Sequence, residues 1–248
     1  MKKTFIITFA LAFLVSSTLR GQTIFLDKVS IDFTKTVAVW PLVKEIDQRW
    51  YDQGKDRMPK QTISQFNFTG DAKQSIYKRT KEAEIPRGMY FEPFADNNVV
   101  YTDYASGTSI SQKPVYEETY LVQDSLLKVK WKITADTRMI AGFECRKAIG
   151  ILFDTVAVFA FYTDEIMING GPEGITGLPG MILGVGIPRL HTTWFATQVK
   201  RLDAIDPKKV APATKGKKGN RTYLFQSINR AMQDWETWGQ KLRLAFLI

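Results

Sequence analysis

Carboxylates are the side chains of this 248-residue chain that could most readily carry out a reaction. Asp164 and Glu165 are adjacent, and Glu118 and Glu173 are further acidic candidates. Because a glycoside hydrolase needs only two carboxyl groups about 5–9 Å apart, a carboxylate-dependent hydrolase acting on glycans or peptides is one open alternative. Adjacent residues of a strand point to opposite faces, so Asp164 and Glu165 would need a further partner to form such a pair or a calcium site.

Other catalytic residue types are scarce. The sequence has one cysteine, Cys145, and one histidine, His191. A single thiol and a single imidazole do not make a zinc site without carboxylates, and the chain has no Gly-x-Ser-x-Gly nucleophile elbow and no phosphate-binding glycine loop. We interpret Cys145 as a buried structural thiol and His191 as a structural or surface residue. The sequence therefore predicts no metal and no cofactor, and it favours a protein that is not an enzyme.

The most informative short segment is Gly177-Leu178-Pro179-Gly180, followed by the apolar run 181–183. Proline suits the second position of a type II turn, and glycine supplies the positive φ of its third position. The segment therefore predicts a turn that leads from a strand ending near Thr163 into a buried strand, with Leu178 packed at the edge of the core.

This segment is one of four that together resemble a known family. Residues 136–148, 161–166, 171–172 and 177–182 occur in the order and spacing typical of the Bacteroidetes family named after its GLPGLI signature. The resemblance implies an exported protein of unknown function. A related bowl-like β domain precedes the catalytic domains of one class of bacterial peptide:N-glycosidase, which implies a non-catalytic role in binding a partner or ligand. The resemblance supplies no catalytic residues, and the signature residues are interpreted as structural: Tyr162, Asp164, Glu165, Gly171, Pro172, Gly177, Leu178, Pro179, Gly180 and Ile182.

The first residues are typical of an export signal. Lys2 and Lys3 precede an apolar run over 5–15, and cleavage is predicted after Gly21. No other stretch approaches the ~20 apolar residues of a membrane-spanning helix. We therefore expect a signal peptide over 1–21, one domain over 22–248, and a final location in the periplasm, at the outer-membrane surface or in the medium.

Most of the formal charge of +9 comes from two short segments of the chain. The predicted signal peptide carries part of it, and residues 200–221 hold eight basic and two acidic residues, which leaves the rest of the chain close to neutral. Residues 203–220 contain proline and glycine and are interpreted as a flexible basic loop. Peripheral contact of residues 207–221 with anionic lipid headgroups is the functional alternative. The lack of interleaved aromatic residues argues against nucleic acid.

Strand patterns dominate the chain and predict a mainly β (α+β) fold, with a curved antiparallel sheet shaped like a bowl or half-barrel. A strand covered on both faces is expected over 154–163, and an amphipathic C-terminal helix is expected over 224–242, with a weaker helix over 41–51. The favoured function is a binding or accessory protein of the cell envelope, for an amphiphilic ligand or an envelope protein partner. The other expected strands are 24–33, 63–68, 75–79, 99–104, 114–123, 127–133, 181–187 and 192–200.

Overall fold

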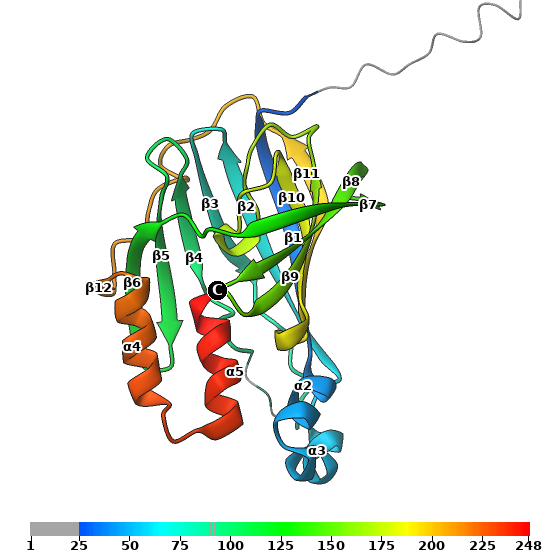
Figure 1. Ribbon diagram of the computed structural model, residues 1–248, viewed down its shortest axis with the longest axis vertical. Coiled ribbons are helices and arrows are strands. Elements are labelled where there is room, and N and C mark those ends of the chain that lie inside the picture. Colours follow the sequence, from blue (N-terminus) through cyan, green and yellow to red (C-terminus); the bar gives the residue numbers. More distant parts are fainter. Residues whose placement is uncertain (1–24, 90, 92) are drawn as a thin grey trace, which may run out of the picture.

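One curved sheet of twelve strands organises the residues that the computed structural model describes, 25–89, 91 and 93–248 (Figure 1). The predicted export signal lies outside the described residues. Within the described part of the chain, no helix is long and apolar enough to cross a membrane. The strands are β1 (Lys28–Ala38), β2 (Gln61–Asp71), β3 (Gln74–Lys81), β4 (Val99–Asp103), β5 (Thr108–Val115), β6 (Glu118–Ser125), β7 (Lys130–Ile140), β8 (Phe143–Leu152), β9 (Val156–Thr163), β10 (Met181–Ile187), β11 (Thr192–Arg201) and β12 (Lys217–Gly219).

The helices lie at one end of the sheet (Figure 1). The α-helices are α2 (Val39–Ile46), α3 (Gln48–Gly54), α4 (Arg221–Ala231) and α5 (Glu236–Leu247), and the 3-10 turns are η1 (Lys55–Arg57), η2 (Pro172–Gly174) and η3 (Pro188–Leu190). α2 follows β1 directly, and α4 follows β12 after a single residue, so each helical segment begins where a strand of the sheet ends.

The strand order is β12-β6-β5-β4-β3-β2-β1-β11-β10-β9-β8-β7, and only the β12–β6 pair is parallel. β6 and β7 lie near opposite ends of this order, although residues 126–129 alone connect them. The chain from Ser125 to Lys130 spans at most about 18 Å. The sheet therefore has to curl until its two ends approach each other, and the predicted mainly β, curved antiparallel sheet is confirmed.

The inside of the curled sheet is filled by the protein's own side chains. Phe33, Phe66 and Phe68 from the strands form one buried cluster with the β9–β10 connection, residues 164–180, and with α5. The connection contributes Ile166, Ile168, Ile175 and Leu178, all of which are buried. Packing of this connection explains why a chain without any disulfide can hold a bowl-shaped sheet, because the apolar faces of most strands share one core.

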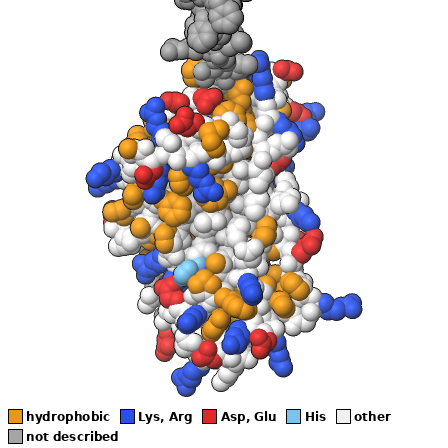
Figure 2. Space-filling model, turned by 90° about the vertical axis from the view of Figure 1, so that its right-hand side faces the viewer, with side chains coloured by type: hydrophobic (Ala, Val, Ile, Leu, Met, Phe, Trp, Pro, Cys, Tyr) orange, Lys and Arg blue, Asp and Glu red, His pale blue; other side chains and the backbone are white. Residues whose placement is uncertain are grey.

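β9 is open on its outer face, so the expectation of a strand covered on both faces is wrong. Val158 and Ala160 are buried on the inner face, whereas Ala157 is exposed and Phe159 and Phe161 are half-buried. The neighbouring strand β10 is buried throughout because its glycines lie beneath aromatic rings: Phe195 covers Gly184, and Phe159 covers Gly186. Figure 2 faces this side of the molecule and shows exposed hydrophobic side chains between lysine and arginine side chains.

The C-terminal helix is broken, which corrects the single helix expected over 224–242. α4 ends at Ala231 and α5 begins at Glu236, after a turn in which Trp235 donates its N–H to the carbonyl of Met232 over 3.2 Å. A Cβ on Gly239 would lie 2.6 Å from that same carbonyl oxygen. The two helices can therefore pack closely only because residue 239 has no side chain.

The helix expected over 41–51 is also two helices, α2 and α3. Asp47 separates them, with an extended backbone, and its carboxylate accepts a hydrogen bond from the N–H of Trp50 over 3.0 Å. This is an N-cap, which satisfies one of the free donors at the start of α3.

Two strand expectations need correction. Residues 114–123 are not one strand but the facing ends of β5 and β6, which turn at Tyr116 with φ +53°. The strand expected over 127–133 begins at Lys130 and runs to Ile140, and Leu127 instead forms an isolated bridge with Ile175. Short-range alternation is the same within one strand and across a tight hairpin, so it does not locate the turn.

The basic segment 203–220 is not entirely a loop. Lys217–Gly219 forms β12 beside β6, and Gln112 donates its side-chain N–H to the carbonyl of Lys215 over 2.8 Å. Val210 is buried. The segment is therefore attached to the sheet at its C-terminal end.

Candidate functional site

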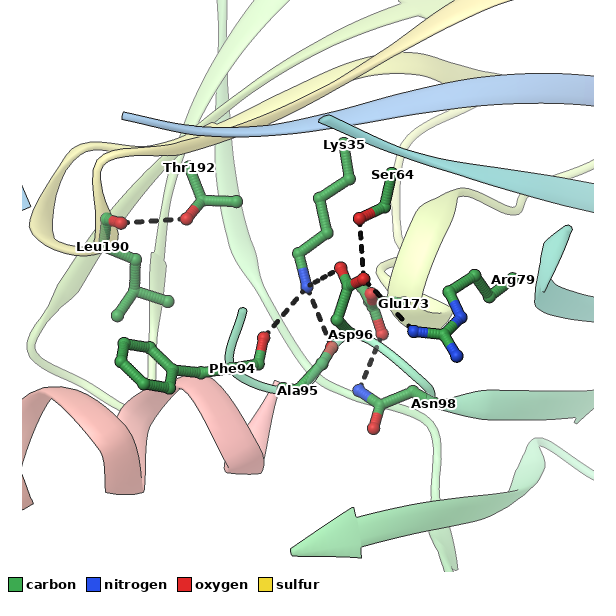
Figure 3. Close-up of polar contacts among 10 residues, drawn as sticks. All are labelled: Lys35, Ser64, Arg79, Phe94, Ala95, Asp96, Asn98, Glu173, Leu190 and Thr192. Carbon is green, nitrogen blue, oxygen red and sulfur yellow. Dashed lines mark hydrogen bonds and ion pairs between the residues drawn. The ribbon is translucent and has the colours of Figure 1, made fainter. Parts of the chain in front are cut away.

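A cluster of buried charged residues lies on the inner face of the sheet, where β1, β2 and β3 meet the segment 93–98 (Figure 3). Lys35 of β1 is only 4% exposed, and its ammonium donates to the carbonyls of Ala95 over 2.8 Å and Phe94 over 3.2 Å. The same ammonium lies 3.4 Å from the carboxylate of Asp96. Lys35 thus exchanges solvent for two carbonyls and an opposite charge, which is the arrangement that a buried lysine requires.

Asp96 connects three strands through its carboxylate. Ser64 of β2 donates its hydroxyl proton to Asp96 Oδ2 over 2.6 Å, and Arg79 of β3 lies 3.4 Å from the same oxygen. Arg79 also approaches the exposed Glu82 at 3.5 Å. The charges of Lys35, Asp96, Arg79 and Glu82 therefore balance within one connected group.

Glu173 enters the same region from η2 in the β9–β10 connection. It is 6% exposed, adopts the left-handed region at φ +54°, and accepts a hydrogen bond from the side-chain amide of Asn98 over 3.0 Å. Its other carboxylate oxygen, Oε1, and Asn98 Oδ1 have no hydrogen-bond partner among the described residues. A strained backbone and a half-satisfied buried carboxylate mark Glu173 as a position that the surrounding packing enforces.

Lys113 of β5 is the other buried charge near Glu173. Its ammonium has no hydrogen-bond partner in the described part of the chain. Burial lowers the pKa of Lys113 to about 8, and the negative charge of Glu173 opposes that shift. Cavities of about 30 Å³ and 20 Å³ adjoin Glu173, the larger also bordered by Lys113 and the smaller by Asn98. Each exceeds the ~10–15 Å³ that a water molecule needs, so ordered water can supply the missing partners.

Burial also raises the pKa of Tyr77 well above its ordinary value, and the negative charges of Glu173 and Asp96 add to that effect. Tyr77 therefore stays neutral and contributes its ring to the core, stacked on Phe66 with ring centroids 5.0 Å apart.

A larger cavity of about 370 Å³ opens beside this cluster, between the end of β3, the segment 93–97, the β5–β6 turn and α5. Arg79, Glu82, Asp96 and Asn97 provide polar groups, and apolar side chains form the rest of the wall. Three of them are aromatic: Phe94, Tyr116 and Phe246. Tyr116 is exposed and packs against Trp235 and Phe246, with ring centroids 5.7 Å and 5.8 Å apart.

The signature residues lie mostly inside the protein. Gly177 is exposed, with φ +96°, and lies under the indole of Trp131, whose Nε1 donates to the carbonyl of Thr176 over 2.9 Å. Gly180 has the expected positive φ, +136°, but its N–H bonds to the carbonyl of Leu178 over 2.9 Å. That bond spans one residue and defines a γ-turn centred on Pro179, so the expected type II turn is wrong. Tyr162, Gly171, Pro172, Leu178 and Ile182 are buried, and Pro179 is exposed.

The candidate carboxylates do not converge. Asp164 is exposed and Glu165 is half-buried after β9, whereas Glu173 lies inside the sheet. Glu118 pairs with Lys217 across β6 and β12 over 2.7 Å. Asp164, Glu165 and Glu118 do not border the cavities on the inner face. The described residues include no group of three or more His, Cys, Asp and Glu that could hold a metal ion.

Cys145 and His191 occupy structural positions. Cys145 is fully buried, as expected, and burial raises the pKa of its thiol to about 12, which suppresses the reactive thiolate. His191 Nε2 lies 2.6 Å from a carboxylate oxygen of Glu45, and Lys241 contacts the other oxygen of Glu45 over 2.8 Å. Hydrogen bonds from Lys241 first, and then from His191, lower the pKa of Glu45. These contacts fasten α2 to α5.

Sequence reasoning missed the buried cluster, although two signals for it were present. Lys35 alternates with Phe33 and Val37, and Lys113 alternates with Ser111 and Val115, all on inward-facing positions. A lysine at a core position of a strand indicates a buried partner. The partners Asp96 and Glu173 come from irregular segments, so no spacing rule could supply them.

Comparison with known protein families gives one match. Residues 74–223 match the family described as "N-glycanase peptide, N-terminal domain". The chain belongs to this family. The match runs from the start of β3 into α4, and it agrees with the relation to a peptide:N-glycosidase that the GLPGLI resemblance implies; membership of the GLPGLI family itself stays a prediction.

One solved structure shows the same fold. "Structure of PNGF-II in C2 space group" matches with TM-score 0.51 and 14% identity, over 85% of this chain and 33% of that chain. The structure of PNGF-II in the P21 space group matches with TM-score 0.49 and 15% identity, over 85% and 34% of the two chains. An uncharacterized conserved protein from Thermus thermophilus matches with TM-score 0.38, 6% identity and coverage of 85% and 99%. The chain thus spans about a third of the PNGF-II chains, and the comparison with curated proteins finds no match.

Proposed function

We propose that this protein is an exported cell-envelope protein that binds an amphiphilic ligand and does not catalyse a reaction. The family supports a domain that accompanies an N-glycanase, because its description names an N-terminal domain. The predicted signal peptide supports export, and predicted contact of residues 207–221 with anionic headgroups would place the protein at a membrane surface. The separation of Asp164, Glu165 and Glu173 removes the support for a carboxylate-dependent hydrolase.

The 370 Å³ cavity beside Arg79 and Asp96 carries the proposal. Ligand sites typically measure about 300–1,000 Å³ and combine apolar walls with a few polar groups. The apolar part of an amphiphile would pack against Phe94, Tyr116 and Phe246, and its polar head would lie near Arg79. The interior of the sheet is filled, so a ligand as large as a lipid chain would bind at this opening and not inside the bowl.

Titration of tryptophan fluorescence tests the site, since Trp235 packs on Tyr116. Decanoate and decylamine serve as anionic and cationic amphiphiles below the concentrations at which they form micelles. We expect saturable binding of one of them, with one copy bound per chain in native mass spectrometry. Tyr116→Ala should weaken binding by about tenfold or more.

Tyr223→Ala is the matched control, because Tyr223 is also an exposed tyrosine but lies on α4, away from the cavity. It should leave the dissociation constant unchanged. Absence of saturable binding, or equal loss in both variants that retain native circular dichroism, would contradict the proposed ligand site.

A further inference from the structure

The two edges of the sheet differ in whether a further strand covers them. At one end β12 adds to β6 and covers its outer edge. At the other end β7 pairs with β8 and, within the described residues, with no further strand. The β9–β10 connection contacts the start of β7: Leu127 bridges to Ile175, and the indole of Trp131 donates to the carbonyl of Thr176 over 2.9 Å. From Lys130 onward, β7 presents an edge to which an extended peptide can add.

The open part of β7 alternates in chemistry between its two faces. Lys130 and Lys132 pair with Ile151 and Ile149 of β8 on the outer face. Trp131 and Ile133 lie on the opposite face, where Ile133 is 47% exposed. A strand laid beside β7 would meet lysine ammonium groups on one face and apolar side chains on the other.

A groove of about 570 Å³ begins at the same place. Its walls include Lys128, Lys130 and Arg221 together with the apolar Leu127, Ile151 and Phe153. Asp154 is the acidic residue of this lining, and Arg221 is balanced by Asp124 at 3.9 Å. Lys128 and Lys130 take part in no ion pair found in the described part of the chain, so the groove and the adjoining edge keep an excess of positive charge.

We propose that an extended acidic segment of a partner protein adds as a strand to β7, starting at Lys130. Its backbone would pair with the open edge, its acidic side chains would meet Lys130 and Lys132, and the alternate apolar side chains would pack beside Ile133. The added strand ends at Ile133, because the pairing of β7 with β8 shifts between Ile133 and Thr137. Further along β7, the Arg138 guanidinium lies 4.6 Å from the ring centroid of Phe195. Charge complementarity thus selects an alternating acidic and apolar sequence.

This surface is separate from the proposed ligand cavity. The cavity lies at the β5–β6 turn beside Tyr116, and the groove lies at the far end of β6 beside Ser125. Failure of ligand binding therefore leaves the strand-addition proposal intact, and the reverse also holds.

Fluorescence anisotropy with a labelled nine-residue peptide of alternating glutamate and valine tests the proposal on the full chain. We expect saturable binding to the wild-type protein. The double variant Lys130→Glu/Lys132→Glu should weaken it by about tenfold or more. The matched control Lys208→Glu/Lys209→Glu changes two exposed lysines of the basic segment and should leave affinity unchanged. Thermal unfolding checks that both variants fold.

Two altered peptides separate strand addition from charge attraction. A peptide N-methylated at every residue keeps its charge but loses its backbone donors on both edges, and it should not bind. A peptide with the same composition in block order, glutamates first, should bind more weakly by a similar factor. Equal binding of either altered peptide, or no binding of the alternating peptide at millimolar concentration, would overturn the proposal.

Discussion

Buried charge is placed at single positions of otherwise apolar strand faces. Lys35 is fully paired through Asp96 and two carbonyls, whereas Lys113 and Glu173 each keep an atom without a partner in the described structure. Removing one member of a buried pair costs more than removing both, since the remaining charge loses its partner. Lys113 and Glu173 border the same cavity but form no ion pair among the described residues, and each is a sensitive position of the inner face.

The pKa of Lys113 predicts an unusual dependence of stability on pH. Its folded-state value of about 8 is below the ordinary 10.5, so between these pH values the unfolded chain binds more protons. The unfolding free energy of the protein therefore rises with pH over that window, by up to roughly 3 kcal/mol, because the folded state no longer has to bury a charged ammonium at Lys113. After burial, which is the largest cause, the charges of Arg221 and Lys35 also lower the pKa of Lys113, and the charge of Glu173 raises it.

Urea unfolding of wild type and Lys113→Met from pH 7 to 10.5 measures this contribution. The difference in unfolding free energy should change in favour of the wild type as pH rises above 8. The late titration of Tyr77 affects both proteins and cancels. Lys208→Met, which removes an exposed lysine, should give a difference that is independent of pH; the same flat result for Lys113→Met would contradict a buried amine.

At the scale of elements, the β9–β10 connection, residues 164–180, leaves the sheet and rejoins it at the same position. Met181 pairs with Thr163, so the whole segment 164–180 has to leave and return at one point. The γ-turn at Pro179 and the positive φ of Gly180 close this excursion. A Cβ on Gly180 would clash with the carbonyl oxygen of Thr163, its cross-strand neighbour.

Substitution of Gly180 should therefore be costly. Gly180→Val combines the strain of a positive φ with that clash, and we expect a loss of more than ~1 kcal/mol in unfolding free energy. Gly107 provides the control, because it also has a positive φ, +66°, but open space around its Cβ position. Gly107→Val should lose less than Gly180→Val in urea unfolding, and similar losses would show that strain alone matters.

The sequence predicted elements well where one strand or helix had an uninterrupted pattern. Alternation and apolar runs located β9, β10 and β11, and Gly180 was correctly expected at positive φ. The predicted element boundaries were wrong where a chain reversal preserves the alternation of apolar and polar residues, as at Tyr116. They were also wrong where a helix ends without a proline or a capping side chain, as at Trp235. The cluster around Asp96 depends on tertiary contacts of an irregular segment, which periodicity does not encode.

At the scale of the molecule, the described residues form three buried apolar clusters that share side chains. The main cluster fills the sheet, a second around Leu224 and Leu242 lies under α4 and α5, and a third around Val39 and Val43 lies under α2. Phe94 and Trp238 pack against both clusters under the helices, and Ala245 of α5 packs against both the main cluster and the α4–α5 cluster. Lys241 fixes α5 to Glu45 of α2 and to the carbonyl of Arg189. The helical end and the sheet are therefore expected to unfold together, as the predicted single domain requires.

Unfolding in urea should follow one transition. Far-UV circular dichroism reports mainly the sheet. Tryptophan fluorescence reports both parts, since Trp40, Trp50, Trp235 and Trp238 lie at the helical end and Trp131 and Trp194 lie in the sheet. Their midpoints should coincide, since shared packing couples the parts. An earlier fluorescence transition with retained strand signal would show instead that the helical end is a separate unit.

The strand order also determines when each strand can pair during synthesis. β1 to β6 follow one another across half of the sheet, β7 to β11 follow one another across the other half, and only the β1–β11 ladder joins them, with Val37 beside Thr192. During synthesis, β1 is made long before β11, and one edge of this eleven-residue strand stays unpaired until residues 192–201 are available. Pairing between such distant segments is slow. The central strand of the finished sheet is thus enclosed late, and β1 keeps one open edge until β11 has been made.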